Sequence, residues 1–220
     1  MVINYPSSAL IIVDVQNDFC PGGALAVEKG DEIIDPLNRL ASLFAGMAGR
    51  VVATQDWHPM GHASFASSHE GKNPGNTVDL SGPKGQGVKA QMLWPDHCVQ
   101  GSRGADFHEA LDLKPVNFII RKGFRKGLDS YSAFFENDRK TPTGLDGFLK
   151  ALSVNTLLFG GLATDYCVLY SALDAAALGF HVIVAGDAIR GVDLPAGSVK
   201  KAFKLFDEAG IIVAEAGDIK

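Results

Sequence analysis

The chain has 220 residues, 46% of them hydrophobic and 20% charged, which is enough to bury one good core and too few for two ordinary domains. Its formal charge of −5, without any run of Lys or Arg, argues against a nucleic-acid or anionic-membrane surface. These features predict a single domain over residues 1–220 whose partner is a small molecule.

The predicted strands and helices alternate along the chain. Apolar, β-branched runs indicate strands buried on both faces, and helical patterns lie between them. In chain order the segments are a strand at Ala9–Val15, a helix at Asp31–Ala45, strands at Val51–Thr54 and Val116–Ile120, a helix at Thr143–Leu152, a strand at Thr156–Phe159, a helix at Asp165–Leu178, a strand at His181–Ala185, a helix at Ala196–Glu208 and a short strand at Gly210–Val213. Since right-handed crossovers place helices on both faces of a sheet, this order predicts a three-layer α/β/α sandwich with a central, mainly parallel sheet. The stretch over residues 63–92, rich in Gly, Ser, Asn and Pro, predicts an irregular insertion that acts as a lid or supports a metal-binding loop.

Polar side chains follow the predicted strands. Asp14 interrupts the end of the first apolar run, Asp56 and His58 follow the second, Lys122 follows the third, and Gly160–Cys167 follows the fourth. Because ligands bind outside the carboxyl ends of strands in an open parallel sheet, these side chains are expected to gather at one edge.

Cys167 follows a turn of small residues and comes just before a helical pattern. Thr164 or Asp165 would cap that helix, which places Cys167 in its first turn. Backbone N–H groups there lack helical partners and the dipole favours negative charge, so the turn suits both a thiolate and an oxyanion. The alternative is a cysteine that serves only as a small buried hydrophobe.

A thiol with a free pKa of about 8.5 needs a proton acceptor or a nearby cation to react at neutral pH. Asp14 lies inside an apolar run, where a carboxylate is costly unless paired, and Lys122 after another such run would be its partner. We predict that Asp14 is the base and Lys122 the cation. The alternatives are an ion pair that only orders a loop and a solvated lysine at a strand end.

Asp56 and His58 stand at positions i and i+2 of an extended strand end and so share one face, with His62 four residues further on. His97 lies in a rigid turn within Trp94–Cys98. A carboxylate and imidazoles suit zinc, iron or manganese and leave open positions for water or a substrate nitrogen. The alternative is one surface histidine and one buried histidine that is bonded to the backbone.

Phe19 and Trp94 are expected to flank the opening of the site. Two aromatic side chains can hold a flat ring between them by offset stacking at little cost in entropy. Core packing is the alternative for both.

Taken together, five motifs resemble those of nicotinamidases, also called pyrazinamidases, in the cysteine-hydrolase branch of the isochorismatase-like superfamily. They are DVQNDFCPGG (14–23), DWHP (56–59), WPDHCV (94–99), RKG (121–123) and GGLATDYCV (160–168). They occur in the family's order and cover most of the chain. Their joint occurrence is far more specific than any one of them.

The resemblance implies roles for individual residues. It implies a catalytic triad of Asp14, Lys122 and Cys167. The metal ligands would be Asp56, His58 and His97, with His62 at a position whose role varies among members. It further implies a cis peptide bond at Leu162–Ala163, an oxyanion hole made by the amides of Ala163 and Cys167, and substrate-binding side chains at Phe19, Trp94 and Tyr131.

By the same resemblance the chain is an amidohydrolase that converts nicotinamide to nicotinate and ammonia through a thioester on Cys167, as part of NAD salvage, and that also deamidates pyrazinamide. One divalent metal ion is implied, with zinc expected first and iron or manganese as the alternatives. Relatives that hydrolyse isochorismate lack the cysteine, so Cys167 argues against that chemistry.

Two rival functions use the same residues differently. Another small-amide hydrolase would act on a carbamoyl or ureido compound, although a flat aromatic clamp beside a metal favours a pyridine amide. A metal-dependent sensor would use Cys167 as a redox switch, and it would need neither Lys122 nor an oxyanion turn.

The expected compartment is the cytoplasm. No apolar run approaches the ~20 residues of a membrane-spanning helix, and the N-terminus lacks a basic-then-apolar signal, so no membrane partner is expected. The three cysteines, an odd number at wide spacing, predict free thiols as in a reducing compartment. A homo-oligomer is compatible with the sequence, which does not determine the oligomeric state.

Overall fold

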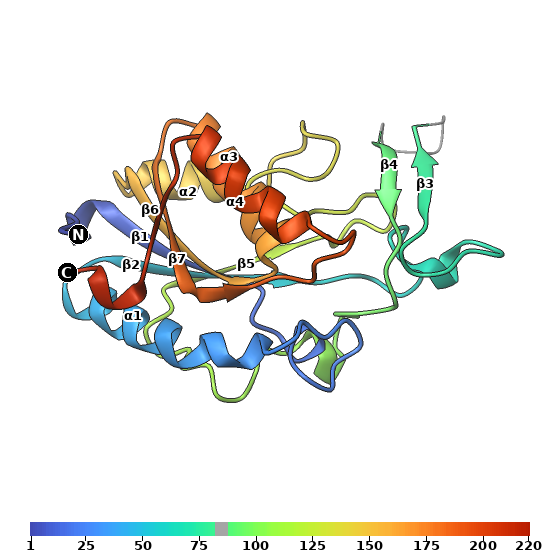
Figure 1. Ribbon diagram of the computed structural model, residues 1–220, viewed down its shortest axis with the longest axis horizontal. Helices are drawn as coiled ribbons and strands as arrows, with labels where there is room; N and C mark the ends of the chain where they lie inside the picture. The colour runs from blue at the N-terminus through green and yellow to red at the C-terminus, as the bar shows by residue number, and fades with distance from the viewer. Residues whose placement is uncertain (82–87) are drawn as a thin grey trace.

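The central sheet is parallel, and helices cover both of its faces (Figure 1). The computed structural model describes residues 1–81 and 88–220, and within them the sheet has six strands in the order β5-β2-β1-β6-β7-β8. Each neighbouring pair in that order is parallel. The strands are β1 (Ser8–Val13), β2 (Arg50–Asp56), β5 (Phe118–Lys122), β6 (Thr156–Leu162), β7 (His181–Arg190) and β8 (Ile212–Ala214).

Alternate side chains of the central strand β1 enter two different cores. Leu10 and Ile12 belong to the core on one face of the sheet, while Ala9, Ile11 and Val13 belong to the core on the other. All five side chains are completely buried. A strand covered on both faces therefore appears in the sequence as a continuous apolar run, which is how it was predicted.

The helices complete the expected three-layer α/β/α sandwich. They are α1 (Ile34–Gly46), α2 (Leu145–Ala151), α3 (Leu169–Ala177) and α4 (Ser198–Glu208). Among the described residues, α1 covers one face with Leu37 and Phe44, and the other three helices cover the opposite face, where α4 contributes Phe206 (Figure 1). None of the helices in this part of the chain is long and apolar enough to cross a membrane.

The stretch at 63–92 is less irregular than expected. It contains two antiparallel strands, β3 (Thr77–Leu80) and β4 (Val88–Met92), while its residues 82–87 lie outside the described part. Both strands are largely exposed, so they lack the apolar run by which the buried strands were recognised. The sequence therefore gave no sign of these two strands within the predicted irregular insertion.

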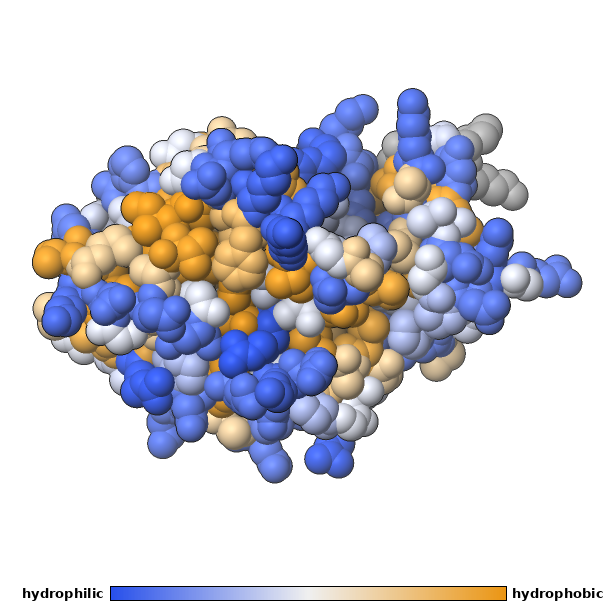
Figure 2. Space-filling view, in the orientation of Figure 1, coloured by the Kyte–Doolittle hydropathy of each residue, from blue (hydrophilic) through white to orange (hydrophobic). Residues whose placement is uncertain are grey.

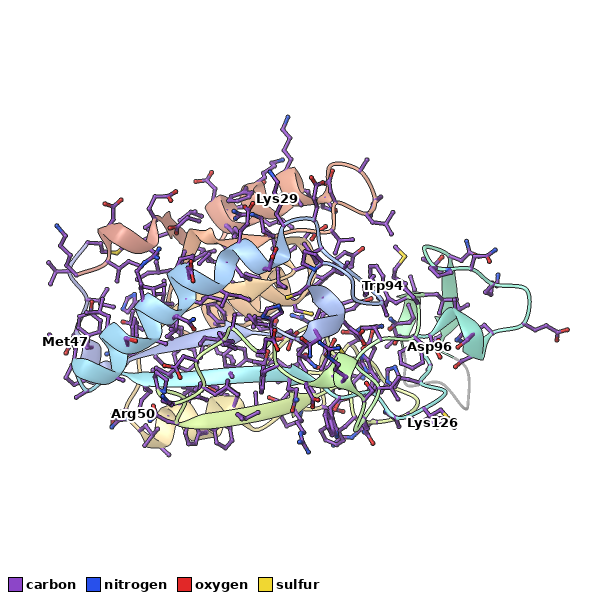
Figure 3. The ribbon with its side chains drawn as sticks, turned by 90° about the horizontal axis from the view of Figure 1, so that it is seen from below. Lys29, Met47, Arg50, Trp94, Asp96 and Lys126 are labelled. Carbon is purple, nitrogen blue, oxygen red and sulfur yellow. The ribbon has the colours of Figure 1, made fainter. Side chains whose placement is uncertain are left out.

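The strands run from the end of the molecule that holds both termini toward the end where β3 and β4 lie (Figure 1). In Figure 3, Arg50, which begins β2, lies near the first end, whereas Trp94 and Asp96 lie toward the second. The carboxyl ends of the strands therefore face the β3–β4 end, and a ligand site is expected there.

The edge strand β8 carries exposed apolar side chains. Ile212 is 52% exposed and Val213 42% exposed. Figure 2 shows hydrophobic residues gathered on the left half of this face, where β8 runs. This apolar surface lies away from the carboxyl ends of the strands.

Candidate active site

The three catalytic candidates and one candidate metal ligand, Asp56, converge at the carboxyl end of the sheet. Asp14 directly follows β1, Asp56 ends β2, Lys122 ends β5, and Cys167 comes shortly after β6. All four side chains are buried. Because β5, β2, β1 and β6 are successive neighbours in the sheet, their ends bring these residues together, as the sequence predicted.

The ammonium of Lys122 lies at the centre of this group. Its Nζ is 2.8 Å from Asp14 Oδ2, 2.5 Å from Asp56 Oδ1 and 3.4 Å from Cys167 Sγ, and it donates to the Ser130 carbonyl at 2.9 Å. Burial alone would lower the pKa of Lys122, but the two carboxylates outweigh burial and raise this pKa well above 10.5. The lysine is therefore a charged, shared counterion.

Asp14 leaves the end of β1 in a left-handed conformation, with a φ of 48°. Thr54 on β2 holds the residue there, since its hydroxyl donates to Asp14 Oδ1 at 2.5 Å and accepts from the Asp14 N–H at 3.1 Å. Gly161 allows the close approach of β6, because a Cβ at that position would lie 2.1 Å from the Val13 carbonyl oxygen. Burial raises the pKa of Asp14 above 3.8, although Lys122 opposes the shift, and this makes Asp14 a stronger base than an exposed aspartate.

Cys167 lies in a π-helical turn (Thr164–Val168) that leads into α3. The N–H of Val168 donates to the Ala163 carbonyl at 3.1 Å and closes this turn. Burial raises the pKa of Cys167 well above 9, and the attraction of Lys122 does not overcome it. A buried thiol keeps its proton until a base removes it, which agrees with the expectation that Cys167 needs a proton acceptor beside it.

Asp14 is close enough to be that base. One carboxylate oxygen of Asp14, one of Asp56 and the sulfur of Cys167 lie within 4.8 Å of one another. In front of the sulfur, the Leu162–Ala163 peptide bond is cis, as the family resemblance implied. Ala163 and Cys167 line the same cavity.

Three side chains direct one ligand atom each toward a common point. The ligand atoms of Asp56, His58 and His97 lie within 4.8 Å of one another, and all three residues are buried. The two carboxylate oxygens of Asp56 face different partners. Oδ1 contacts Lys122, whereas Oδ2 lies 3.5 Å from His58 Nε2 and 3.9 Å from His97 Nε2. One carboxylate thus belongs to both groups of the site.

Hydrogen bonds fix which nitrogen of each imidazole is free. Nδ1 of His58 lies 2.8 Å from the Gly123 carbonyl, and Nδ1 of His97 lies 2.8 Å from the Pro95 carbonyl. Since a carbonyl can only accept, each Nδ1 carries the hydrogen and each Nε2 keeps a lone pair for a metal ion. Gly123 needs to be glycine, because its φ is +64° and a Cβ there would lie 2.5 Å from His58 Cε1. This donor set fits a divalent first-row ion with open positions.

The charges around these ligands favour a cation. Burial lowers the pKa of His58, but the carboxylates of Asp56 and Asp129 outweigh burial and raise it above 6.5. In contrast, burial and the neighbouring charge of His58 lower the pKa of His97 to about 4. The carboxylates therefore favour a positive charge beside Nε2 of His58, which a metal ion would supply in place of a proton, while the imidazole of His97 stays neutral.

His62 uses both ring nitrogens within the protein. Its Nε2 lies 3.0 Å from the Arg125 carbonyl and 3.3 Å from the Leu128 carbonyl, so this nitrogen carries the hydrogen. Its Nδ1 then accepts from the Ser64 hydroxyl at 2.7 Å. The ring stacks on His58 with 4.3 Å between centroids. His62 thus contacts a candidate ligand without offering a free nitrogen of its own.

Cys167 lines a small cavity, and the predicted side chains Phe19, Trp94 and Tyr131 all line it as well. Trp94 packs edge-on against Tyr166, with 4.8 Å between centroids, and donates its Nε1–H to the Tyr131 hydroxyl at 3.2 Å. The structure therefore places the predicted aromatic residues together at the mouth of the site.

Other residues of this cavity wall were not singled out from the sequence: Leu25, Asp129, Tyr166 and Val192. Asp129 accepts from Gln91 Nε2 and from the Ser130 N–H, both at 2.8 Å, and lies 4.0 Å from His58 Nε2. It belongs to the loop after β5, where no periodicity indicates the direction of a side chain. Tyr166 could have been found from its position next to Cys167.

Comparisons with known proteins agree with one another. Residues 8–218 match the isochorismatase domain family. The nicotinamidase of Acinetobacter baylyi is 48% identical over 203 residues, which cover 92% of this chain and 90% of that protein. The solved nicotinamidase pyrazinamidease of Acinetobacter baumanii has a TM-score of 0.90 at 46% identity and covers 97% of this chain and 98% of that one. The pyrazinamidase of Pyrococcus horikoshii, solved in complex with zinc, has a TM-score of 0.76 at 33% identity and covers 96% of this chain and 99% of that one.

Proposed function

The chain belongs to the isochorismatase family, and we propose that it is a nicotinamidase, an amidohydrolase that converts nicotinamide to nicotinate and ammonia. The observation that carries this proposal is the buried group of Asp14, Lys122 and Cys167, which opens onto a cavity with aromatic walls. Pyrazinamide is a flat ring amide of the same size, so we expect it to be a substrate as well. The name of the Acinetobacter baumanii relative supports this expectation.

In the first step, the proton of the Cys167 thiol passes to the Asp14 carboxylate while Sγ forms a bond to the carboxamide carbon. The π electrons of the carbonyl move onto its oxygen. Lys122 stays positively charged and stabilises the sulfur, which lies 3.4 Å from its Nζ. The amides of Ala163 and Cys167 are the proposed donors to the oxyanion, because both residues line the cavity and Ala163 follows the cis peptide bond that the family resemblance implies there.

In the second step, Asp14 returns the proton to the amide nitrogen, the C–N bond breaks and ammonia leaves, so that a thioester remains on Cys167. Water then attacks the thioester carbon and gives a proton to Asp14. The C–S bond breaks, and Cys167 recovers its proton from Asp14. The product leaves as nicotinic acid, which gives its carboxyl proton to solvent water and becomes nicotinate. The raised pKa of Asp14 suits a group that takes and returns a proton in each half of the reaction.

We assign Asp56, His58 and His97 as the ligands of one divalent ion, and we propose zinc because their nitrogen and oxygen donors suit it and a relative was solved with it. When bound, the ion supplies a Lewis-acidic position for the ring nitrogen of the substrate. Phe19, Trp94 and Tyr131 are proposed to orient the ring. His62 is assigned a supporting role beneath His58, since both of its nitrogens are occupied by protein groups.

The replacement Cys167→Ala tests the nucleophile. We expect this variant to release no ammonia from nicotinamide above background, whereas Cys20→Ala, which removes a buried thiol outside the site, should stay active. Mass spectrometry of the unmodified enzyme quenched during turnover should show the thioester on Cys167. Turnover by Cys167→Ala would rule out the scheme. Faster turnover of N-carbamoyl amino acids or ureidoacrylate than of nicotinamide would instead retain the chemistry and reject the substrate.

A further inference from the structure

Gln16 bonds to the main chain of Asp56 through both ends of its carboxamide. Its Oε1 accepts from the Asp56 N–H at 2.7 Å, and its Nε2 donates to the Asp56 carbonyl at 2.8 Å. The same Nε2 donates to the Ala105 carbonyl at 2.8 Å, and the side chain is completely buried. Gln16 therefore satisfies both polar backbone groups of a residue that we assign as a metal ligand.

The fold creates the need for this contact. The ladder between β1 and β2 ends at the pair Ile12 and Ala53, because β1 turns away at Asp14. Asp56 lies beyond that end, so its N–H and C=O have no β1 residue to pair with. Unpaired backbone groups in a buried position are costly. The carboxamide of Gln16 takes the place of the missing peptide group.

We propose that Gln16 is a positioning residue that sets the metal affinity of the site by fixing the main chain of Asp56. The proposal rests on the metal site of the proposed function. Asp56 has to direct Oδ2 toward His58 and His97 while Oδ1 stays on Lys122, and both contacts depend on where its backbone lies. Loss of a partner that orients a ligand weakens metal binding by about tenfold to a hundredfold.

Gln55 offers a matched control. Its Nε2 donates to the same Ala105 carbonyl, also at 2.8 Å, while its Oε1 accepts from Arg121 Nε at 3.0 Å. It is 5% exposed, so its burial is close to that of Gln16. Removing either carboxamide takes one hydrogen bond from Ala105, but only the loss of Gln16 removes the bonds to Asp56.

The test compares the metal-free unmodified protein with Gln16→Met and Gln55→Met, since methionine is close to glutamine in shape and lacks the amide. Zinc affinity is measured by competition with a chromophoric chelator, and urea unfolding of the metal-free proteins is measured alongside. We expect Gln16→Met to bind zinc about tenfold to a hundredfold more weakly than the unmodified protein. Gln55→Met should bind zinc with an affinity close to that of the unmodified protein.

The outcomes separate the two proposals. If the unmodified protein does not bind zinc, the metal assignment of the proposed function is wrong. If it binds zinc and Gln16→Met binds equally well, or if Gln55→Met loses as much affinity, the role of Gln16 is refuted. Should Gln16→Met fail to fold, Gln16→Asn replaces it, because this side chain keeps the amide but is one methylene too short to reach Asp56. The same loss of affinity is expected, and unchanged affinity overturns the proposal.

Discussion

Replacing Lys122 with methionine should destabilise the metal-free protein through the carboxylates that it leaves behind. The ammonium lies 2.8 Å from Asp14 Oδ2 and 2.5 Å from Asp56 Oδ1, and the side-chain exposures are 0%, 0% and 6% for Lys122, Asp14 and Asp56. Methionine fills much of the same space without a charge. Because Asp56 still faces His58, most of the effect is expected at Asp14.

Proton binding limits how much free energy of unfolding the replacement of Lys122 can remove. A buried carboxylate without a partner can take up a proton, and at pH 7 this costs about 4 kcal/mol for a group with an ordinary pKa near 3.9, at about 1.4 kcal/mol for each pH unit. Removing one member of a buried ion pair typically costs about 3–5 kcal/mol, which agrees with that limit. We therefore expect Lys122→Met to lower the free energy of unfolding by about 4 kcal/mol at pH 7.

The free energy that Lys122→Met removes should depend on pH. Loss of Lys122 raises the folded-state pKa of Asp14 further above its unfolded value, so the protonated form is favoured by folding. The stability that comes from protonating Asp14 in the folded state is fully present below the pKa of Asp14 in the unfolded chain. It is lost as the pH rises through the pKa of Asp14 in the folded variant. If Asp14 is ionised in the unmodified protein at neutral pH, as a base must be, the loss caused by Lys122→Met should shrink by about 1.4 kcal/mol for each pH unit from 7 to 5.

Urea unfolding at pH 7 and pH 5 measures both effects. Lys150→Met is the control, because Lys150 pairs with Asp146 at 2.9 Å on the surface and should cost no more than about 0.5 kcal/mol. Adding Asp14→Asn to Lys122→Met should recover part of the stability, since the unpaired charge is then removed. If Lys122→Met costs as little as Lys150→Met, or if Asp14→Asn recovers nothing, the shared ion pair does not stabilise the protein as described.

The other predictions concern activity and metal binding. For the metal-loaded enzyme, kcat/KM for nicotinamide should fall on acidification with a midpoint above pH 3.8. Protonation of Asp14 removes the base, and burial raises the pKa of this carboxyl group. A kcat/KM that stays constant below pH 3.8, in protein shown to be folded by circular dichroism, would contradict this prediction. Lys122 should cause no loss of kcat/KM on the alkaline side below pH 10.5, since its pKa lies well above that value. Dialysis against a chelator should weaken substrate binding. His97→Ala should weaken zinc binding, whereas His181→Ala, at an exposed position that begins β7, should not. Equal zinc affinities of the His97→Ala variant and the unmodified protein would remove His97 from the ligand set.

The sheet and its strand-end residues could be predicted because each leaves a local signal. A strand buried on both faces is a continuous apolar run, and Asp14 is conspicuous as a carboxylate that interrupts such a run. The parallel order then brings the ends of β5, β2, β1 and β6 together without further information. The observed ends of the strands differ from the predicted ends by a few residues. For example, β7 continues to Arg190, beyond its predicted end at Ala185.

Residues that reach the site from loops left no such signal. Asp129 and Val192 line the cavity, yet the directions of their side chains depend on contacts with distant segments. Asp129 is held by Gln91 of β4, and the Val192 N–H donates to Asp165 at 3.0 Å. The raised pKa of Cys167 could not be predicted either, because the sequence shows the start of a helix but not how deeply the residue is buried.

The sequence predicted Asp56 as a metal ligand but did not show that its carboxylate also contacts the catalytic lysine. One of its oxygens contacts Lys122 and the other faces His58 and His97. A cation bound at Oδ2 would draw negative charge away from Lys122 and leave more of its attraction for Asp14 and Cys167. The metal ligands and the proton-transfer group are therefore coupled through one carboxylate, so the effects of removing the metal and of replacing Lys122 on kcat/KM should not add.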